Sequence, residues 1–206
     1  MIRKTLALVT ATVTAAVAGV LVLGPQATAH DAAYRAKLRD PGGKVVGTVE
    51  FRITRDAMHV DAELWKNSYV TPNAFHGFHV HANNDDANGR GCQADARQPS
   101  TTWFVSADGH LSETGQGHGQ HNGDMPSPLV LKNGTARLQF ATDRIAPEIL
   151  RGRAVVLHAN PDNFGNVPVG TGPNQYTPNS PGATDLTART GNAGDRVACG
   201  VVRRWW

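Results

Sequence analysis

Short segments in which apolar and polar residues alternate recur along the chain from residue 32 onward. Alternation with a period of two, together with β-branched residues, is typical of strands. The segments cover residues 32–40, 44–53, 58–65, 75–82, 127–143, 153–159 and 196–202. Turn residues such as Pro41-Gly42-Gly43 separate them, and Asn133-Gly134 predicts a hairpin turn. The pattern predicts an all-β sandwich or barrel, with a single helical turn over residues 146–151.

Two long stretches lack any strand pattern and are rich in Gly, Asn, Asp, Ser and Pro. They cover residues 82–125 and 161–195. Loops of this length that stay ordered in a compact domain are usually functional, and they need to be fixed to the rest of the fold.

The first 29 residues differ in character from the remainder. Arg3 and Lys4 precede an almost wholly apolar run over residues 5–24, and the segment ends in Ala-x-Ala at Ala29. This order is typical of a secretory signal peptide, and a membrane anchor is the alternative. We therefore expect a signal peptide over residues 1–29 and one domain over residues 30–206 that is extracellular and, after cleavage, not bound to a membrane.

Charge and cysteine content narrow the function classes. The chain has 20 basic and 17 acidic residues, and loss of Arg3 and Lys4 leaves a net charge of +1. Neither this balance nor any basic run with interleaved aromatic residues supports a nucleic-acid partner. Cys92 and Cys199 are the only cysteines, and outside the cytoplasm they predict a disulfide, with two free buried thiols as the alternative.

Histidines are concentrated in two of the predicted strands. Strand alternation places His79 and His81 on one face, and Phe78 and Val80 on the other. In the same way His158 lies opposite its two apolar neighbours. Three imidazoles can therefore line the outer wall of a β-barrel while the apolar side chains enter its core.

A Gly-rich segment after the first histidine strand supplies further donors. It contains His110, His118, His121 and Asp124, the last three spaced by three residues. Histidines with one carboxylate form a set of ligands suited to zinc, whereas four histidines suit copper. Two sets of four then share His110: one with His79, His81 and His158, the other with His118, His121 and Asp124. A shared imidazole needs a cation on each of its ring nitrogens.

Successive motifs of the chain resemble the copper/zinc superoxide dismutases, in the order in which that family has them. The motifs are GFHVH at 77–81, Gly91-Cys92, HNGDMP at 121–126, VVLHANPDNFGN at 155–166 and GDRVACGVV at 194–202. The resemblance covers essentially all of residues 32–203. It implies a Greek-key β-barrel or sandwich of about eight antiparallel strands with two long functional loops.

The resemblance also implies a role for each matching residue. Copper would be held by His79, His81, His110 and His158, and zinc by His110, His118, His121 and Asp124. Asp162 matches a carboxylate that links a copper histidine to a zinc histidine, and Cys92 and Cys199 match the family disulfide. His110 and Arg196 match the catalytic residues, the arginine guiding the anionic substrate to the copper. His76 matches a histidine that is not a ligand.

The implied function is that of a secreted enzyme that converts superoxide to oxygen and hydrogen peroxide. The spacing from His118 to His121 is shorter than in many members of the family, so a copper-only enzyme stays open. A non-catalytic metal-binding protein is a second alternative, against which the retention of Arg196 argues, and a zinc hydrolase is a third. The sequence leaves the oligomeric state open and allows a homodimer. It also leaves open roles for His30, the new N-terminus, and for Trp205-Trp206.

Overall fold

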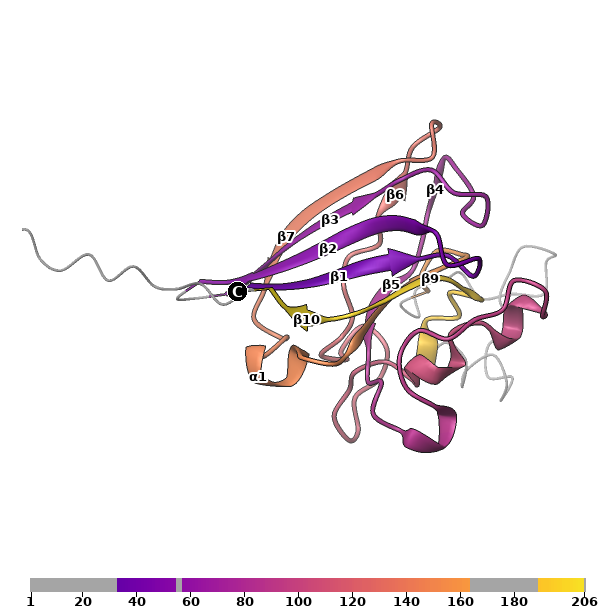
Figure 1. Cartoon of the computed structure of the whole chain (residues 1–206). Helices are drawn as coiled ribbons and strands as arrows, with labels where there is room; N and C mark the ends of the chain where they lie inside the picture. The colour runs from indigo at the N-terminus through magenta and orange to yellow at the C-terminus, as the bar shows by residue number, and fades with distance from the viewer. Residues whose placement is uncertain (1–32, 55–56, 164–188, 206) are drawn as a thin grey trace, which may run out of the picture. The chain divides into compact units, whose positions relative to one another are not determined.

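The computed structural model describes residues 33–54, 57–163 and 189–205, all within the unit Asp31–Trp206. Their main feature is one eight-stranded sheet in which every pairing is antiparallel (Figure 1). The strands are β1 Ala33–Arg39, β2 Val45–Ile53, β3 Met58–Leu64, β5 Phe78–His81, β7 Ala136–Thr142, β8 Ala154–His158, β9 Arg196–Val201 and β10 Arg203–Arg204. A second sheet pairs β4 Ala74–Phe75 with β6 Leu129–Val130. This confirms the predicted all-β fold with about eight antiparallel strands, and α1 Pro147–Leu150 confirms the predicted helical turn.

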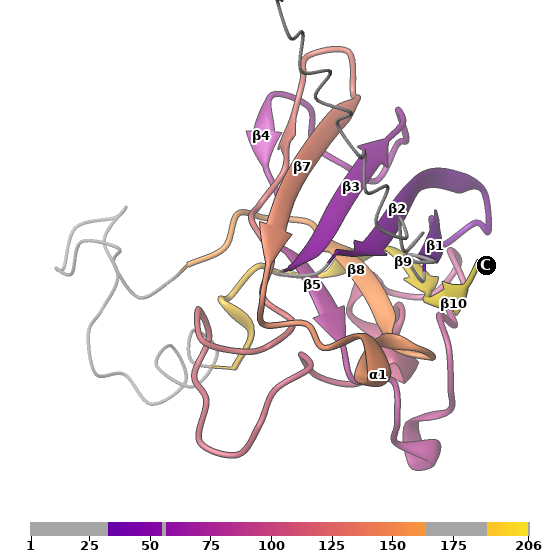
Figure 2. The same ribbon diagram turned by 90° about the vertical axis from the view of Figure 1, so that its left-hand side faces the viewer.

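The strand order explains how distant parts of the chain reach one site. The order is β5-β8-β9-β1-β2-β3-β7, with β10 also on β1. The chain runs through β1, β2 and β3 as neighbours, crosses to β5 at the other end of the sheet, returns to β7 and crosses again to β8. Figure 2 shows β7, β3 and β2 side by side. Among the described residues no ladder joins β5 to β7, so the sheet is a curled half-barrel rather than a closed barrel.

The core lies inside the curl and follows the predicted alternation. Leu38, Phe51 and Val49 are fully buried on β1 and β2, and Phe78 and Val80 meet them from β5. Full burial of such side chains contributes roughly 1.5–3 kcal/mol each. The opposite faces of β5, β8 and β9 are therefore left to carry polar chemistry under the loops.

The predicted turn at Asn133-Gly134 forms, but the strands that flank it pair elsewhere. The amide of Leu131 donates to the carbonyl of Thr135 at 2.8 Å, and Gly134 has a φ of +85° that favours glycine. However, β6 pairs with β4 and β7 pairs with β3. The segment is thus a turn between two sheets rather than a hairpin of one.

The first long loop is fixed to the sheet by a covalent bond. Cys92 and Cys199 form a disulfide that joins the loop to β9, which confirms that prediction. Three short 3-10 helices occupy the loop, at Asp86–Asn88, Ser100–Thr102 and Val105–Ala107, so no strand interrupts it. A second apolar cluster, including Phe104, Val156 and Cys199, packs beneath it on the outer face of the sheet.

The C-terminal residues are part of the sheet. Arg203 and Arg204 pair with Arg35 and Tyr34 of β1, and the amide of Trp205 donates to the carbonyl of Ala33 at 2.8 Å. The segment up to Trp205 is thus held against β1 by backbone hydrogen bonds.

Several sequence predictions fall outside the described residues. The signal segment 1–29, His30 and Trp206 are among them, and so is most of the second long loop, residues 164–188. Within the described ranges, none of the helices has the length and apolar character needed to cross a membrane.

Candidate metal centre

Strand β5 buries side chains on both of its faces. Phe78 and Val80 enter the core, whereas His79 and His81 face the opposite side, where they are 0% and 1% exposed. Strand β8 runs antiparallel beside β5 and brings in His158, which is also buried. The predicted outer wall of histidines therefore forms, and loops cover it.

The segment that carries the remaining donors folds back along β5. The amide of Leu111 donates to the carbonyl of Val80, and the amide of Val80 donates to the carbonyl of Gly123, each at 2.8 Å. These bonds set His81 opposite His110 and His79 opposite Asp124 in isolated β-bridges. A side chain at residue 123 would collide with the Val80 carbonyl, so the close approach requires glycine.

The first group of donors consists of four buried histidines. Each offers one ring nitrogen, and these atoms all lie within 4.8 Å of one another: His79, His81, His110 and His158. The four residues are those expected to hold copper.

Hydrogen bonds to the outer ring nitrogens fix the tautomers of three of these rings. The Nδ1 atom of His81 donates to the carbonyl of Asp108 at 2.8 Å, and the Nδ1 atom of His158 to the carbonyl of Gly194 at 3.0 Å. The Nε2 atom of His79 donates to the carboxylate of Asp162 at 2.9 Å. Each inner nitrogen is therefore left with a lone pair, which is the form that binds metals.

The inner nitrogens face one another in an arrangement that hydrogen bonding does not satisfy. The Nε2 atoms of His81 and His158 are 3.3 Å apart, and both are acceptors because the protons are on Nδ1. The Nδ1 atom of His79 and the Nε2 atom of His110 are buried and have no hydrogen-bond partner within the described ranges. Converging lone pairs in a buried site fit a cation, so these residues fit copper.

A second group of donors surrounds the carboxylate of Asp124. Its Oδ1 atom lies 3.1 Å from Nδ1 of His110 and 3.3 Å from Nδ1 of both His118 and His121. Four ligands at zinc bond lengths of about 2.0 Å in a tetrahedron are separated by roughly 3.3 Å. The donor types and the distances from Asp124 to the three histidines therefore fit zinc, and His110 lies between the two groups.

The tightest second grouping is not identical to the predicted zinc set. The four residues whose donor atoms all lie within 4.8 Å of one another are His79, His110, His118 and Asp124, with His79 in place of His121. The ring nitrogens of His79 are already directed at Asp162 and at the first group. The Nδ1 atom of His121 lies 3.2 Å from that of His110. We therefore favour His121 as the fourth member.

Asp162 contacts one histidine of each donor group. Its Oδ1 atom is 2.9 Å from Nε2 of His79 and 3.3 Å from Nε2 of His118, and Ser127 donates to its other oxygen. The carboxylate side chain is 1% exposed. Such a link orients one ring of each group at once.

Burial and hydrogen bonding shift the pKa values of the cluster in opposite directions. Burial lowers the pKa of His110 from 6.5 to about 4, and lowers those of His81 and His158 in the same direction. For His118, burial acts to lower the pKa, but hydrogen bonds to Asp124 and Asp162 outweigh it and raise the pKa to about 9. In the metal-free protein His118 is therefore protonated at neutral pH, and its positive charge partly replaces the charge of a bound cation.

Arg196 lies at the start of β9 and is held by the first long loop. Its guanidinium donates to the carbonyls of Phe104 and Asp108, both at 2.5 Å. The carbonyl of Asp108 thus holds both Arg196 and His81. Sequence reasoning missed Asp108 and Gly194, because a backbone carbonyl leaves no signal in the residue type.

His76 belongs to neither group, and its ring nitrogens lie 2.9 and 2.8 Å from the carbonyls of His158 and Thr71.

Comparisons with known proteins point to one family. The family model described as copper/zinc superoxide dismutase matches residues 45–202. The chain is 35% identical over 173 residues to the Cu-Zn superoxide dismutase of Mycolicibacterium paratuberculosis, covering 80% of this chain and 71% of that protein. It is 30% identical to the extracellular Cu-Zn superoxide dismutase of Brugia pahangi, covering 81% of this chain and 73% of that one.

The fold has a relative among solved structures. A crystal structure of a double mutant of a SOD-like protein from Bacillus subtilis matches with a TM-score of 0.55 and 22% identity, covering 81% of this chain and 95% of that chain. At this identity the match concerns the fold alone. The match to the family model extends from the start of β2 past the end of β9, the span that carries every donor described above. The chain belongs to the copper/zinc superoxide dismutase family.

Proposed function

We propose that this chain is a secreted superoxide dismutase that converts superoxide to oxygen and hydrogen peroxide, with copper and zinc as cofactors. The observation that carries the proposal is the group of four buried imidazole nitrogens within 4.8 Å of one another, joined through His110 to a carboxylate-containing group. Family membership supports the same activity.

The two proposed metals have different tasks. When bound, copper supplies the one-electron chemistry that the reaction needs, and zinc, which has no redox chemistry, supplies a fixed positive charge. We assign copper to His79, His81, His110 and His158, and zinc to His110, His118, His121 and Asp124. Asp162 would keep one ring of each set in position, because its carboxylate lies against His79 and His118.

The proposed role of His110 is to move a proton at its Nε2 atom. Its Nδ1 atom is engaged by Asp124 at 3.1 Å, whereas Nε2 is buried and has no hydrogen-bond partner among the described residues. Because no neighbouring acceptor in that part of the chain competes for a proton on Nε2, the proton can pass to the peroxide product.

The proposed role of Arg196 is to attract and orient the superoxide anion. Hydrogen bonds to the carbonyls of Phe104 and Asp108 hold its guanidinium in one place beside the first group. Arginine keeps its charge at every physiological pH, so the attraction is constant.

The activity is tested by loading the protein with copper and zinc and measuring superoxide consumption. Rapid consumption that depends on copper is expected. Metal-replete, folded protein without this activity would refute the proposal and leave a metal-binding protein on the same fold.

Zinc assignment is tested by metal analysis of the wild type and a His121→Ala variant. We expect the variant to lose zinc while it retains copper, because His121 belongs only to the second set. Equal zinc content in both proteins would exclude His121 as a ligand. Wild-type protein that binds only copper would instead identify a copper-only enzyme.

Export and assembly are separate parts of the proposal. The order of charged, apolar and small residues over 1–29 supports cleavage after Ala29, and mass spectrometry of the exported protein should find His30 first. Exposed apolar side chains at Phe75, Leu129 and Leu131 support a homodimer. Light scattering that reports a monomer at micromolar concentration would contradict the homodimer.

A further inference from the structure

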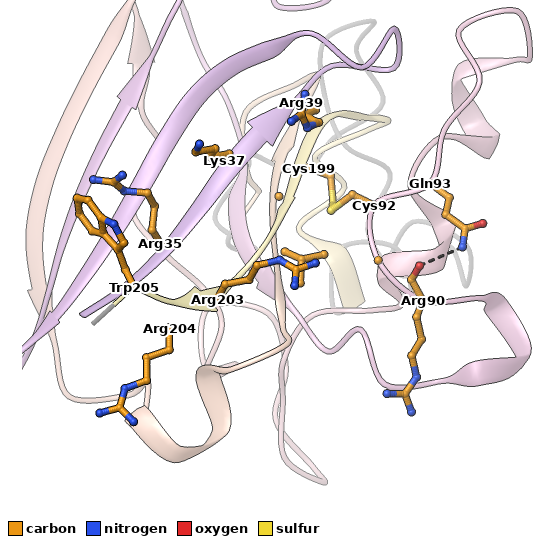
Figure 3. A pocket seen from close by; sticks show the side chains of 13 residues that line it. Arg35, Lys37, Arg39, Arg90, Cys92, Gln93, Cys199, Arg203, Arg204 and Trp205 are labelled. Atoms are coloured by element: carbon orange, nitrogen blue, oxygen red, sulfur yellow. Dashed lines mark hydrogen bonds between the residues drawn. A yellow bond between two sulfur atoms is a disulfide. The ribbon is translucent and has the colours of Figure 1, made fainter. Parts of the chain in front are cut away.

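A cavity lined by basic side chains lies on the outer face of β1, β9 and β10, apart from both donor groups. Its volume is about 680 Å³, and the first long loop forms its facing wall. Six of its lining residues are cationic: Arg35, Lys37, Arg39, Arg90, Arg203 and Arg204. Figure 3 shows Lys37, Arg39 and Arg203 around the Cys92–Cys199 disulfide, with Arg90 and Gln93 on the loop opposite.

The fold gathers these cations in one place. Residues 35, 37 and 39 alternate with buried Ala36 and Leu38 on β1, so their side chains share the outer face at intervals of about 7 Å. Arg203 joins them because β10 pairs with β1, in the register Arg35↔Arg203. The disulfide then holds the loop with Arg90 across from this row.

Most of this charge is not neutralised by neighbouring acidic groups. Arg35 pairs with Glu50 and Arg90 with Asp86. Within the described part of the chain, Lys37, Arg39 and Arg203 have no ion-pair partner. Like charges at such spacing repel one another, so the cavity is complementary to an anion with several charges.

The chemistry of the lining restricts the kind of anion. Arginine and lysine side chains are donors only, and the described residues of the lining include no carboxylate. The amide nitrogen of Gln93, also in the lining, already donates to the Arg90 carbonyl at 3.0 Å. A ligand that presents acceptors and no donors therefore fits, and guanidinium forks match phosphate oxygens in particular.

Two other classes of polyanion fit less well. An acidic peptide could not add to the sheet here, because β1 is hydrogen-bonded to β2 on one side and to β9 and β10 on the other. Nucleobases stack on aromatic rings, but Trp205 is the single aromatic residue among the described residues of the lining, and the Arg35 guanidinium lies over its ring.

We propose that this basic cavity binds a chain of phosphate groups through Lys37, Arg39 and Arg203. Inorganic polyphosphate presents this chemistry without bases that need aromatic partners. The lining side chains belong to neither donor group, so the proposal does not depend on the enzymatic function.

The test is calorimetric titration of the metal-loaded protein with short-chain inorganic polyphosphate at two salt concentrations. The double variant Lys37→Glu/Arg203→Glu, called the groove variant below, should bind polyphosphate at least tenfold more weakly than the wild type. The slope of log K against log salt concentration should be smaller by about 2, one for each lost cation. The matched control Lys66→Glu/Lys132→Glu changes the net charge equally at exposed positions outside the cavity. Because both variants keep the metal ligands, any chelation of metal by polyphosphate affects them alike.

Comparison of probes identifies the source of the phosphate chain. Polyphosphate should bind more tightly than an oligothymidylate, and the reverse order would overturn the proposal in favour of a nucleic acid. Poly-glutamate that binds as tightly as both would overturn the proposal in favour of unspecific charge attraction. Equal losses in the groove and control variants would also overturn it. Reduced superoxide turnover in the groove variant with unchanged polyphosphate binding would reassign the cations to steering of superoxide.

Discussion

The main-chain oxygen of Asp108 lies 2.8 Å from the Nδ1 atom of His81 and accepts a hydrogen bond from it. The same oxygen accepts a hydrogen bond from Arg196. Asp108 itself has a φ of +63°, and its carboxylate accepts from the amides of Asn84 and Asp85 at 2.6 and 2.8 Å. One residue thus positions both His81, a proposed copper ligand, and Arg196, the proposed guide for the substrate.

Substitution of Asp108 should separate its backbone and side-chain contributions. Asp108→Gly loses the carboxylate but adopts the positive φ freely, whereas Asp108→Ala loses the carboxylate and is also strained, by about 1–3 kcal/mol. We expect the alanine variant to have the lower free energy of unfolding in urea and the lower superoxide activity. Equal behaviour of the two variants would show that backbone conformation at this position does not matter.

Loss of the Asp162 carboxylate should weaken both metal groups. In Asp162→Asn an uncharged amide replaces the carboxylate that contacts His79 and His118. Loss of such outer partners typically lowers metal affinity by about 10- to 100-fold. Competition with a chelator measures the affinities of copper and zinc. Asp61→Asn is the control, since its carboxylate contacts Arg137 and Gln139 away from the site. An affinity change confined to one metal would argue against the bridging role.

Replacement of Arg196 should distinguish charge from geometry. Arg196→Gln removes the charge, so kcat/KM for superoxide should fall by about tenfold or more and respond less to ionic strength. Arg196→Lys keeps the charge but not the fork that reaches Phe104 and Asp108 together. Its kcat/KM should fall while the response to ionic strength persists. A lysine variant as insensitive to salt as the glutamine variant would contradict the charge argument.

Acid should destabilise the metal-free protein well above the pKa of its carboxylates. The pKa of His110 is about 4 in the folded state and 6.5 in the unfolded state, so the unfolded state binds more protons between these values. The free energy of unfolding therefore decreases as the pH is lowered from 6.5 to 4. His81 and His158 act in the same direction. His118, raised to about 9, acts oppositely, and its contribution is lost as the pH rises from 6.5 through 9.

Urea unfolding of metal-free protein between pH 4 and pH 7 measures this effect. His110→Phe should show a shallower loss of stability toward acid than the wild type, because one buried imidazole no longer takes up a proton on unfolding. His59→Phe replaces an exposed histidine and should leave the slope unchanged. Parallel slopes in all three proteins would contradict the assignment.

The disulfide should matter for both stability and activity. It closes a loop of 107 residues, for which chain-entropy arguments give about 4–5 kcal/mol. The carbonyl of Gln93, next to Cys92, accepts from the amide of Phe104, and the carbonyl of Phe104 accepts from Arg196. We expect Cys92→Ser/Cys199→Ser to unfold at lower urea and to turn over superoxide more slowly. Unchanged turnover at full folding would separate the loop anchor from the Arg196 position.

Strand positions could be predicted from sequence because alternation is a local property. His79 and His81 were assigned to the face opposite Phe78 and Val80 for that reason, and the structure has them there. The pairing of strands is not local. Asn133-Gly134 predicts the turn, but no local pattern predicts that β6 pairs with β4.

The site was predictable in composition but not in assembly. Motif resemblance identified His110, Asp124 and Asp162, whereas their proximity results from backbone pairing of a loop with the edge of β5. No residue-type pattern encodes that pairing beyond the requirement for glycine at position 123. For the same reason the sequence does not predict the basic cavity, because its cations come from three separate segments: residues 35–39, residue 90 and residues 203–204.

The position of β9 has a consequence for the order of assembly. This strand is formed by residues 196–201, yet it lies between β8 and β1 and joins the two halves of the sheet. Without this strand, β1, β2, β3 and β7 form one part of the sheet and β5 and β8 another, with no ladder between the two parts among the described residues. Closure of the sheet therefore depends on pairing between segments that are far apart in the sequence, which is a slow step in folding. Ala198→Pro, which removes a ladder hydrogen-bond donor in the middle of β9, should abolish folding as a whole rather than loosen one edge.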